Sequence, residues 1–211
     1  SVQHIRRAWK DQKGEFETVL ERNVGAILKE IDRLAEIASG FSRFGAPAAA
    51  GNVPLEPVDV GVVAREVLTL YRGGEGGPID FAADISVDLP RISARETELK
   101  EVLSNLLENA RAAIEGDGSV IIEARSVPTA VEIRVRDDGT GIPVDLMGRI
   151  FEPQFSTRST GTGLGLAIVR KLVESWGGMV TAEVDRGKGT VIRLQLRPWT
   201  EAERTDGEEP S

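Results

Sequence analysis

Residues 95–114 read RETELKEVLSNLLENARAAI, and this stretch decides the fold. Its apolar side chains recur at spacings of three and four, the pattern of a helix with one buried face. The residues on that face are Leu99, Val102, Leu103, Leu106, Leu107, Ala110, Ala113 and Ile114. We therefore predict a long amphipathic helix that is ended by the Glu-Gly-Asp-Gly turn at residues 115–118.

The segments on either side of this helix predict a sheet for it to cover. Alternating apolar residues indicate strands, and spacings of three and four indicate two further helices. The predicted strands are residues 79–87, 119–126, 129–136, 179–184 and 190–196, and the further helices are residues 58–71 and 163–176. Residues 58–197 thus form an α/β sandwich with helices on one mostly antiparallel sheet.

The N-terminal part has a different pattern. Between residues 15 and 44 two apolar rows repeat every seven residues: Val24, Ile31 and Ala38, and Ile27, Leu34 and Phe41. A stripe this narrow favours a coiled-coil-like helical hairpin at residues 1–45, through which two copies pair along residues 15–44. The alternative is a long helix packed on its own domain. The fold class is therefore α+β.

Two segments lack periodicity. Residues 46–57 are rich in Pro, Gly and Ala and predict a linker, and residues 198–211 predict a disordered acidic tail. The chain starts within a helical pattern without a capping signal. We therefore expect a fragment of a longer protein.

Composition excludes several classes of function. The 211 residues carry 26 basic and 34 acidic side chains, a net charge of −8, which argues against nucleic-acid binding. No cysteine is present, and the one histidine is His4, so disulfides, thiolate nucleophiles and multi-histidine metal sites are excluded. No run of 18 apolar residues occurs, so we expect no membrane contact within this chain and a cytoplasmic location.

Chemistry-bearing residues gather in a few short segments. Asn105 and Asn109 lie one turn apart on the predicted helix, where the two amides can hold Mg²⁺ through their oxygens or reach phosphate oxygens; the alternative is a pair of surface amides. Asp137 ends a strand just before Gly139 and Gly141, where its carboxylate is placed to accept a hydrogen bond from a base amine. The alternative there is a plain Asp-Gly turn.

Two glycine-rich segments follow. Thr160 to Leu166 reads TGTGLGL and opens a helix, so its backbone N–H groups can meet a phosphate; the alternative is a loop with no ligand. The spacing is neither that of a Rossmann loop nor that of a Walker A loop. Residues 187–190, Gly-Lys-Gly-Thr, form a turn in the last hairpin.

In this order, these segments resemble the nucleotide-binding boxes of the GHKL superfamily (the Bergerat fold), most closely those of bacterial sensor histidine kinases. Asn105–Ala110 resembles the N box, Asp137–Gly141 the first glycine box and Phe151–Thr157 the F box. Gly161–Leu166 and Gly187–Thr190 resemble the other two glycine boxes. The stretches Glu30–Phe44 and Leu55–Asp59 are similar to the second dimerisation helix of nitrogen-regulation sensor kinases and to the entry into the domain that follows it.

The resemblance implies ATP and Mg²⁺ as cofactors and a role for each residue. Asn109 holds Mg²⁺, with Asn105 beside the metal and phosphates, and both are the catalytic residues. Asp137 accepts the adenine amino group. The other cofactor-binding residues are Gly139, Gly141 and Thr190 near adenine, Gly161, Thr162, Gly163, Leu164 and Gly165 around the phosphates, and Arg158 in a mobile lid at residues 148–162.

The chain also departs from the family. Members that hydrolyse ATP carry Glu where this chain has Asn105, which favours phosphoryl transfer over hydrolysis. Ala112 replaces a frequent lysine, and Gln154 replaces an aromatic residue. The family's phosphate acceptor is a histidine in a motif resembling H-E-[IL]-[KR]-N-P-L, whereas His4 is followed by Ile-Arg-Arg, so the acceptor is expected upstream of this chain.

The expected function is therefore the ATP-binding part of a sensor histidine kinase. It passes the γ-phosphoryl group to an upstream histidine and then to the receiver domain of a response regulator. Two alternatives remain at this point: a GHKL serine kinase of the anti-sigma type, and a dimeric scaffold that binds no nucleotide. Whether the parent protein is anchored in the inner membrane is left open.

Overall fold

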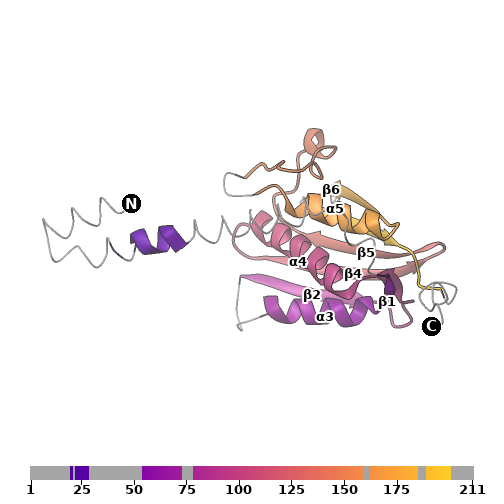
Figure 1. Cartoon of the computed structure of the whole chain (residues 1–211). Coiled ribbons are helices and arrows are strands. Elements are labelled where there is room, and N and C mark those ends of the chain that lie inside the picture. Colours follow the sequence, from indigo (N-terminus) through magenta and orange to yellow (C-terminus); the bar gives the residue numbers. More distant parts are fainter. Residues whose placement is uncertain are drawn as a thin grey trace, which may run out of the picture. The chain divides into compact units, whose positions relative to one another are not determined.

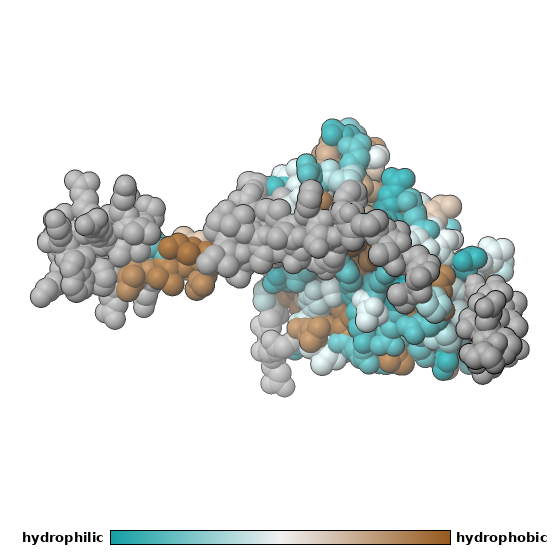
Figure 2. Space-filling view, in the orientation of Figure 1, coloured by the Kyte–Doolittle hydropathy of each residue, from teal (hydrophilic) through white to brown (hydrophobic). Residues whose placement is uncertain are grey.

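A computed structural model describes Leu20 and residues 22–28, 54–72, 78–158, 162–184 and 189–200. The chain divides into two compact units, Ser1–Ala46 and Pro47–Ser211. In the first unit Leu20 and residues 22–28 are helical. This short helix exposes apolar surface, with Val24, Ile27 and Leu28 exposed by 42%, 41% and 55% (Figure 2). The rest of the predicted hairpin lies outside the described residues.

The second unit is built on a five-stranded sheet in the order β2-β4-β5-β7-β6. β2 and β4 pair in parallel and the other neighbours pair antiparallel. The strands are β2 (Ile79–Ile85), β4 (Gly118–Val127), β5 (Ala130–Asp137), β6 (Met179–Val184) and β7 (Thr190–Leu196). The mixed, mostly antiparallel sheet predicted from the sequence is thus confirmed.

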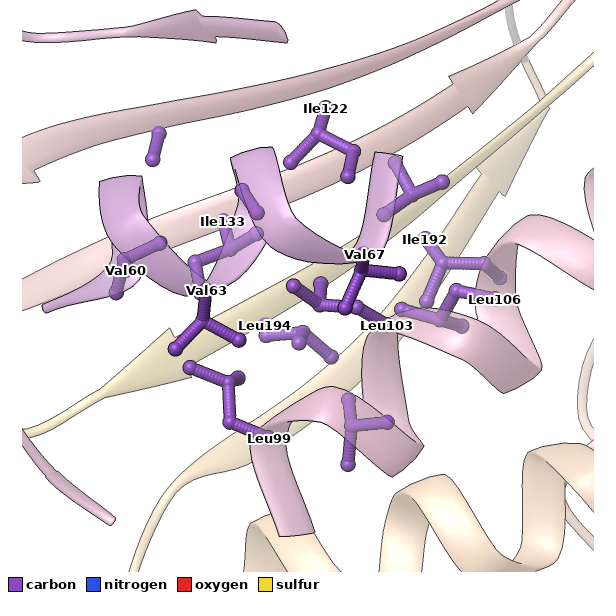
Figure 3. Close-up of a cluster of buried hydrophobic side chains, with 14 of the residues drawn as sticks. Val60, Val63, Val67, Leu99, Leu103, Leu106, Ile122, Ile133, Ile192 and Leu194 are labelled. Carbon is purple, nitrogen blue, oxygen red and sulfur yellow. The ribbon is translucent and has the colours of Figure 1, made fainter. Parts of the chain in front are cut away.

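Three helices cover one face of this sheet: α3 (Val60–Tyr71), α4 (Glu96–Ala113) and α5 (Gly165–Ser175) (Figure 1). Their apolar stripes meet the inward-facing side chains of the strands in one core. Figure 3 shows Val63 and Val67 of α3 and Leu103 of α4 beside Ile133 and Leu194 of the sheet. α4 buries the face predicted for it, because Leu99, Val102, Leu103, Leu106, Leu107 and Ala110 are all at most 4% exposed.

The other face of the sheet is polar. Glu132 on β5 accepts ion pairs from Arg134 at 2.6 Å and from Arg193 on β7 at 3.4 Å. Arg193 also pairs with Glu183 on β6 at 2.9 Å. This alternation of a buried apolar face and a charged face is typical of an antiparallel sheet covered on one side only.

The structure corrects the start of the second unit. Glu56–Val58 forms β1, which pairs antiparallel with β3 (Ile92–Ala94). The sequence pattern places Glu56 and Pro57 in the linker, starts the next helix at Val58 and predicts no strand at residues 92–94. Strands of three residues are too short to show a period of two, and Asp59 caps α3 by accepting the N–H of Val62 at 3.0 Å.

The C-terminal end is also corrected. We predicted disorder from Pro198 onward, but Pro198 bridges to Ile92, and the N–H of Trp199 donates to the carbonyl of Arg91 at 2.7 Å. These residues continue β7 past Leu196 and pair beside β3. Residues 201–211 lie outside the described part. Within the described residues, no helix combines the length and hydrophobicity that spanning a membrane requires.

Two leucines of α3 allow a test of how this helix packs against the sheet. Leu68 is 1% exposed and Leu70 is 79% exposed. We expect Leu68→Ala to lower the free energy of unfolding by about 2–5 kcal/mol, because it leaves a cavity. Leu70→Ala on the same helix should change it by less than about 0.5 kcal/mol. Urea unfolding followed by circular dichroism measures both; equal losses would contradict the one-sided packing of α3.

Candidate nucleotide site

The two asparagines of α4 face the first residue of α5. A Cβ atom on Gly165 would lie 3.0 Å from Asn105 Oδ1 and 3.5 Å from Asn109 Nδ2, so a glycine lets the helices approach. Asn105 Nδ2 donates to the carbonyl of Glu101 at 3.0 Å. Asn109 Nδ2 is buried and has no partner among the described residues. This amide is an exception to the rule that buried polar groups are hydrogen-bonded.

Asp137 ends β5 and is 6% exposed. Its Oδ1 accepts two backbone hydrogen bonds, from Gly139 N–H at 3.0 Å and from Thr190 N–H at 3.3 Å. Oδ2 accepts none from the residues that the structure describes. The carboxylate is therefore fixed through one oxygen and presents the other as a free acceptor.

Close backbone approaches build the walls around Asp137. A Cβ on Gly139 would lie 2.5 Å from the carbonyl oxygen of Ala113, at the end of α4. Thr140 N–H donates to the same carbonyl at 3.0 Å. Gly189 has φ +94°, and a Cβ there would overlap the carbonyl oxygen of Asp137. The loop after β5 is thereby pressed between α4 and the start of β7.

The two neighbouring aspartates have opposite electrostatics. Burial raises the pKa of Asp137, although the N–H groups of Gly139 and Thr190 counteract it. The pKa of the exposed Asp138 is lowered, chiefly by the backbone N–H of Ser119 and further by its hydroxyl, both at 2.9 Å. Asp138 therefore stabilises the loop as an anion, whereas ionising Asp137 is costly.

The segment between the first glycine loop and α5 is tied at its base. Gln154 N–H donates to the carbonyl of Gly163 at 2.9 Å, and Gln154 has the left-handed φ of +65°. A Cβ on Gly163 would lie 2.5 Å from the carbonyl carbon of Gln154. Within this segment Arg158 reaches α4, where its guanidinium donates to the carbonyl of Asn109 at 3.1 Å.

A pocket of about 460 Å³ opens beside the glycine loop. It is lined by Thr140, Gly141, Ile142, Pro143, Thr157, Val184 and Gly189. The loop after β5, the predicted lid and the turn end of the β6–β7 hairpin thus face one space, which is large enough to admit part of a small molecule.

The structure brings most of the predicted site residues together in two groups. Asn105, Asn109, Gly165 and Arg158 meet at α4, and Asp137, Gly139 and Thr190 meet at the end of β5. Gly141 lines the pocket, Thr162 Oγ1 accepts the N–H of Leu164 at 3.4 Å, and Leu164 is buried. Gly161 lies outside the described residues.

Sequence reasoning missed three contributors. Gly189 was inside a predicted glycine box, but its contact with Asp137 depends on the pairing of β5 with β7. Ala113 contributes only its carbonyl, which leaves no signal in a sequence. Gln154 stood out as a departure from the family pattern, and its left-handed backbone gives that position a structural role.

A two-layer sandwich whose glycine loops surround a buried aspartate and a helix asparagine defines a nucleotide-binding domain. A family model described as histidine kinase-, DNA gyrase B- and HSP90-like ATPase matches residues 94–200. This chain belongs to that ATPase family.

Relatives and solved structures narrow the similarity to histidine kinases. The sensor histidine kinase ZraS of Escherichia coli K12 is 34% identical over 169 residues, 80% of this chain and 36% of ZraS. The nitrogen regulation protein NtrY of Azorhizobium caulinodans is 28% identical over 98% of this chain and 27% of NtrY. The chain spans about a third of the length of the curated relatives it matches.

The histidine kinase ThkA is similar in structure. Its catalytic domain alone is 33% identical with a TM-score of 0.64, over 72% of this chain and all of that domain. ThkA in complex with the response regulator protein TrrA has a TM-score of 0.76 and 26% identity, over 94% of this chain and 55% of that chain. The GHKL sandwich predicted from the sequence is confirmed.

The opposite pKa shifts of the two aspartates predict opposite effects on stability. Folding raises the pKa of Asp137, so the folded state holds its proton more tightly, and ionisation costs stability above that pKa. Asp137→Asn should therefore be more stable than the wild type at pH 8, with the difference closing as the pH falls. Asp138→Asn should be less stable at pH 8, and that difference too should close in acid. The Asp138 difference closes only below the ordinary carboxyl pKa of 3.8, whereas the Asp137 difference closes as the pH falls toward that value. Urea unfolding from about pH 2 to pH 8 measures both; differences of the same sign at pH 8 would contradict the assignment.

Proposed function

We propose that this chain is the ATP-binding catalytic part of a sensor histidine kinase. One observation carries the proposal: Asp137 is buried, held through Oδ1, and has an Oδ2 acceptor free of the described residues. A buried acceptor needs a donor, and the exocyclic amine of adenine supplies one. Gly139 and Gly189 keep the walls free of side chains, so a flat base can lie against the backbone.

We place the phosphates of ATP at the group of site residues that meets on α4. α5 begins at Gly165 beside Asn105 and Asn109, and the backbone N–H groups at a helix start attract phosphate. The buried amide of Asn109 lacks a partner in the described structure, which fits a ligand at this point. Asn109 would hold Mg²⁺ through its oxygen, and the metal would neutralise phosphate charge. Arg158, already at Asn109, is placed to contact a phosphate.

The residue at position 105 of α4 favours transfer of the γ-phosphoryl group over hydrolysis of ATP. At Asn105 the chain has a neutral amide, and its Nδ2 is engaged with the carbonyl of Glu101. A neutral amide is a poor general base, so it does not activate water for attack on ATP. The γ-phosphoryl group of ATP then remains available for transfer to a histidine. We place that histidine elsewhere in the longer protein, because the sequence around His4 lacks the acceptor motif.

The partners follow from the same proposal. The structure of ThkA with a response regulator supports transfer onward to a receiver domain. The apolar surface of Val24, Ile27 and Leu28 supports a homodimer through residues 15–44. The similarity to the sensor histidine kinase ZraS supports a sensor kinase as the parent protein. We place this part of it in the cytoplasm, where ATP is available.

Nucleotide binding tests the proposal. We expect the chain to bind ATP with Mg²⁺, and Asp137→Asn to bind at least about tenfold more weakly, because its amide would face the adenine amine donor to donor. Asp138→Asn is the control and should bind like the wild type. Isothermal titration calorimetry measures all three. If neither the wild type nor Asp137→Asn binds ATP, the chain is a nucleotide-independent scaffold instead.

Self-labelling tests the position of the acceptor. Incubated with [γ-³²P]ATP and Mg²⁺, the chain should bind nucleotide without gaining acid-labile phosphate. His4→Ala should behave in the same way as the wild type. Acid-labile label on the wild type that His4→Ala removes would show that His4 is the acceptor and that the reading of its sequence context is wrong.

A further inference from the structure

The start of α4 is capped by a residue from outside the helix. The first N–H groups of a helix have no partner within it, and Arg95, at the N-cap position, makes no capping bond with its side chain. Glu56 on β1 supplies one instead, because its Oε1 accepts the N–H of Glu96 at 3.0 Å. The partial positive charge of the helix dipole at this end also stabilises a carboxylate there.

The same end of α4 is bonded to the end of α5. Glu98 Oε2 accepts the indole N–H of Trp176 at 2.7 Å and pairs with Arg95 at 3.0 Å. Arg197 donates to the carbonyl of Trp176 at 3.3 Å. At the opposite end of the two helices, Gly165 packs against the asparagines of α4. The two helices are thus in contact at the start of α4 and again along its second half.

Glu56 lies on the segment that arrives from the first unit, which ends at Ala46. β1 has three residues, and Pro57 at its centre has no N–H to donate. Its hold on the domain therefore depends on few contacts: pairing with β3, burial of Val58, and the bond from Glu56 to α4. β1 lies close to the start of α4 (Figure 1).

We propose that Glu56 is a positioning residue for the nucleotide site, which ties β1, near the start of the second unit, to the helix that carries Asn105 and Asn109. The inference rests on the proposed nucleotide binding. Its physical basis is that a cap fixes where a rigid helix sits along its axis, and the close contact with Gly165 leaves the asparagines little room to shift. Misplacement by about 1 Å is enough to weaken such a site.

Two caps in the same segment provide a matched test. Glu56→Ala removes the cap of α4, and Asp59→Ala removes the cap of α3, a helix without candidate site residues. In the full chain, calorimetry with ATP and Mg²⁺ should show about three- to tenfold weaker binding for Glu56→Ala and no change for Asp59→Ala. Glu56→Gln keeps an acceptor oxygen and should bind within about twofold of the wild type.

A second measurement needs no nucleotide. In NMR spectra of the free protein, Glu56→Ala should shift the side-chain amide signals of Asn105 and Asn109, and Asp59→Ala should leave them in place. If the wild type binds no ATP, the proposed function fails and these signals still decide the role of Glu56. Unchanged amide signals and wild-type affinity in Glu56→Ala, or equal losses in Asp59→Ala, would reduce Glu56 to a structural cap and overturn the proposal.

Discussion

The packing of α4 on the sheet is the contact on which both core and site depend. Six apolar side chains of this helix are buried, and burial of each of the five leucine and valine side chains among them contributes about 1.5–3 kcal/mol. The same burial sets the rotation of the helix, so Asn105 and Asn109 emerge at its margin beside Gly165. Its last turn offers the carbonyl of Ala113 to the loop after β5. A rotation of α4 would thus disturb the core and both groups of site residues together.

The energetically unfavourable features of the second unit are concentrated at the candidate nucleotide site. Asp137 is an acid in a buried place, Gln154 holds a left-handed backbone, and Asn109 has an amide without a described partner. Elsewhere the described part of the second unit follows ordinary rules, with apolar residues inward and paired charges on the open face of the sheet. Local violations in an otherwise consistent fold are expected where a ligand completes the structure.

The sequence predicted the long elements and not the short ones. α4 was predictable because its apolar stripe spans about four turns, and β6 and β7 because apolar side chains recur at every second position along most of each strand. β1, β3 and the pairing of Pro198 were missed, since three residues carry no period and pairing between distant segments leaves no local mark. At the site, motif order pointed to Asp137, Asn109 and the glycines. The cap from Glu56 to Glu96 joins residues 40 positions apart and was invisible for the same reason.

The acidic charge of the chain constrains how it recognises a nucleotide. A protein of net charge −8 repels a polyphosphate at long range, and salt screens that repulsion to about 8 Å under physiological conditions. Under the proposed function, attraction would therefore come from contacts: backbone N–H groups at the start of α5, the guanidinium of Arg158 and a metal at Asn109. Such contacts bind phosphate without regard to the base. Selection of adenine would then fall to Asp137, a role that would account for a buried carboxylate at a place where burial opposes its charge.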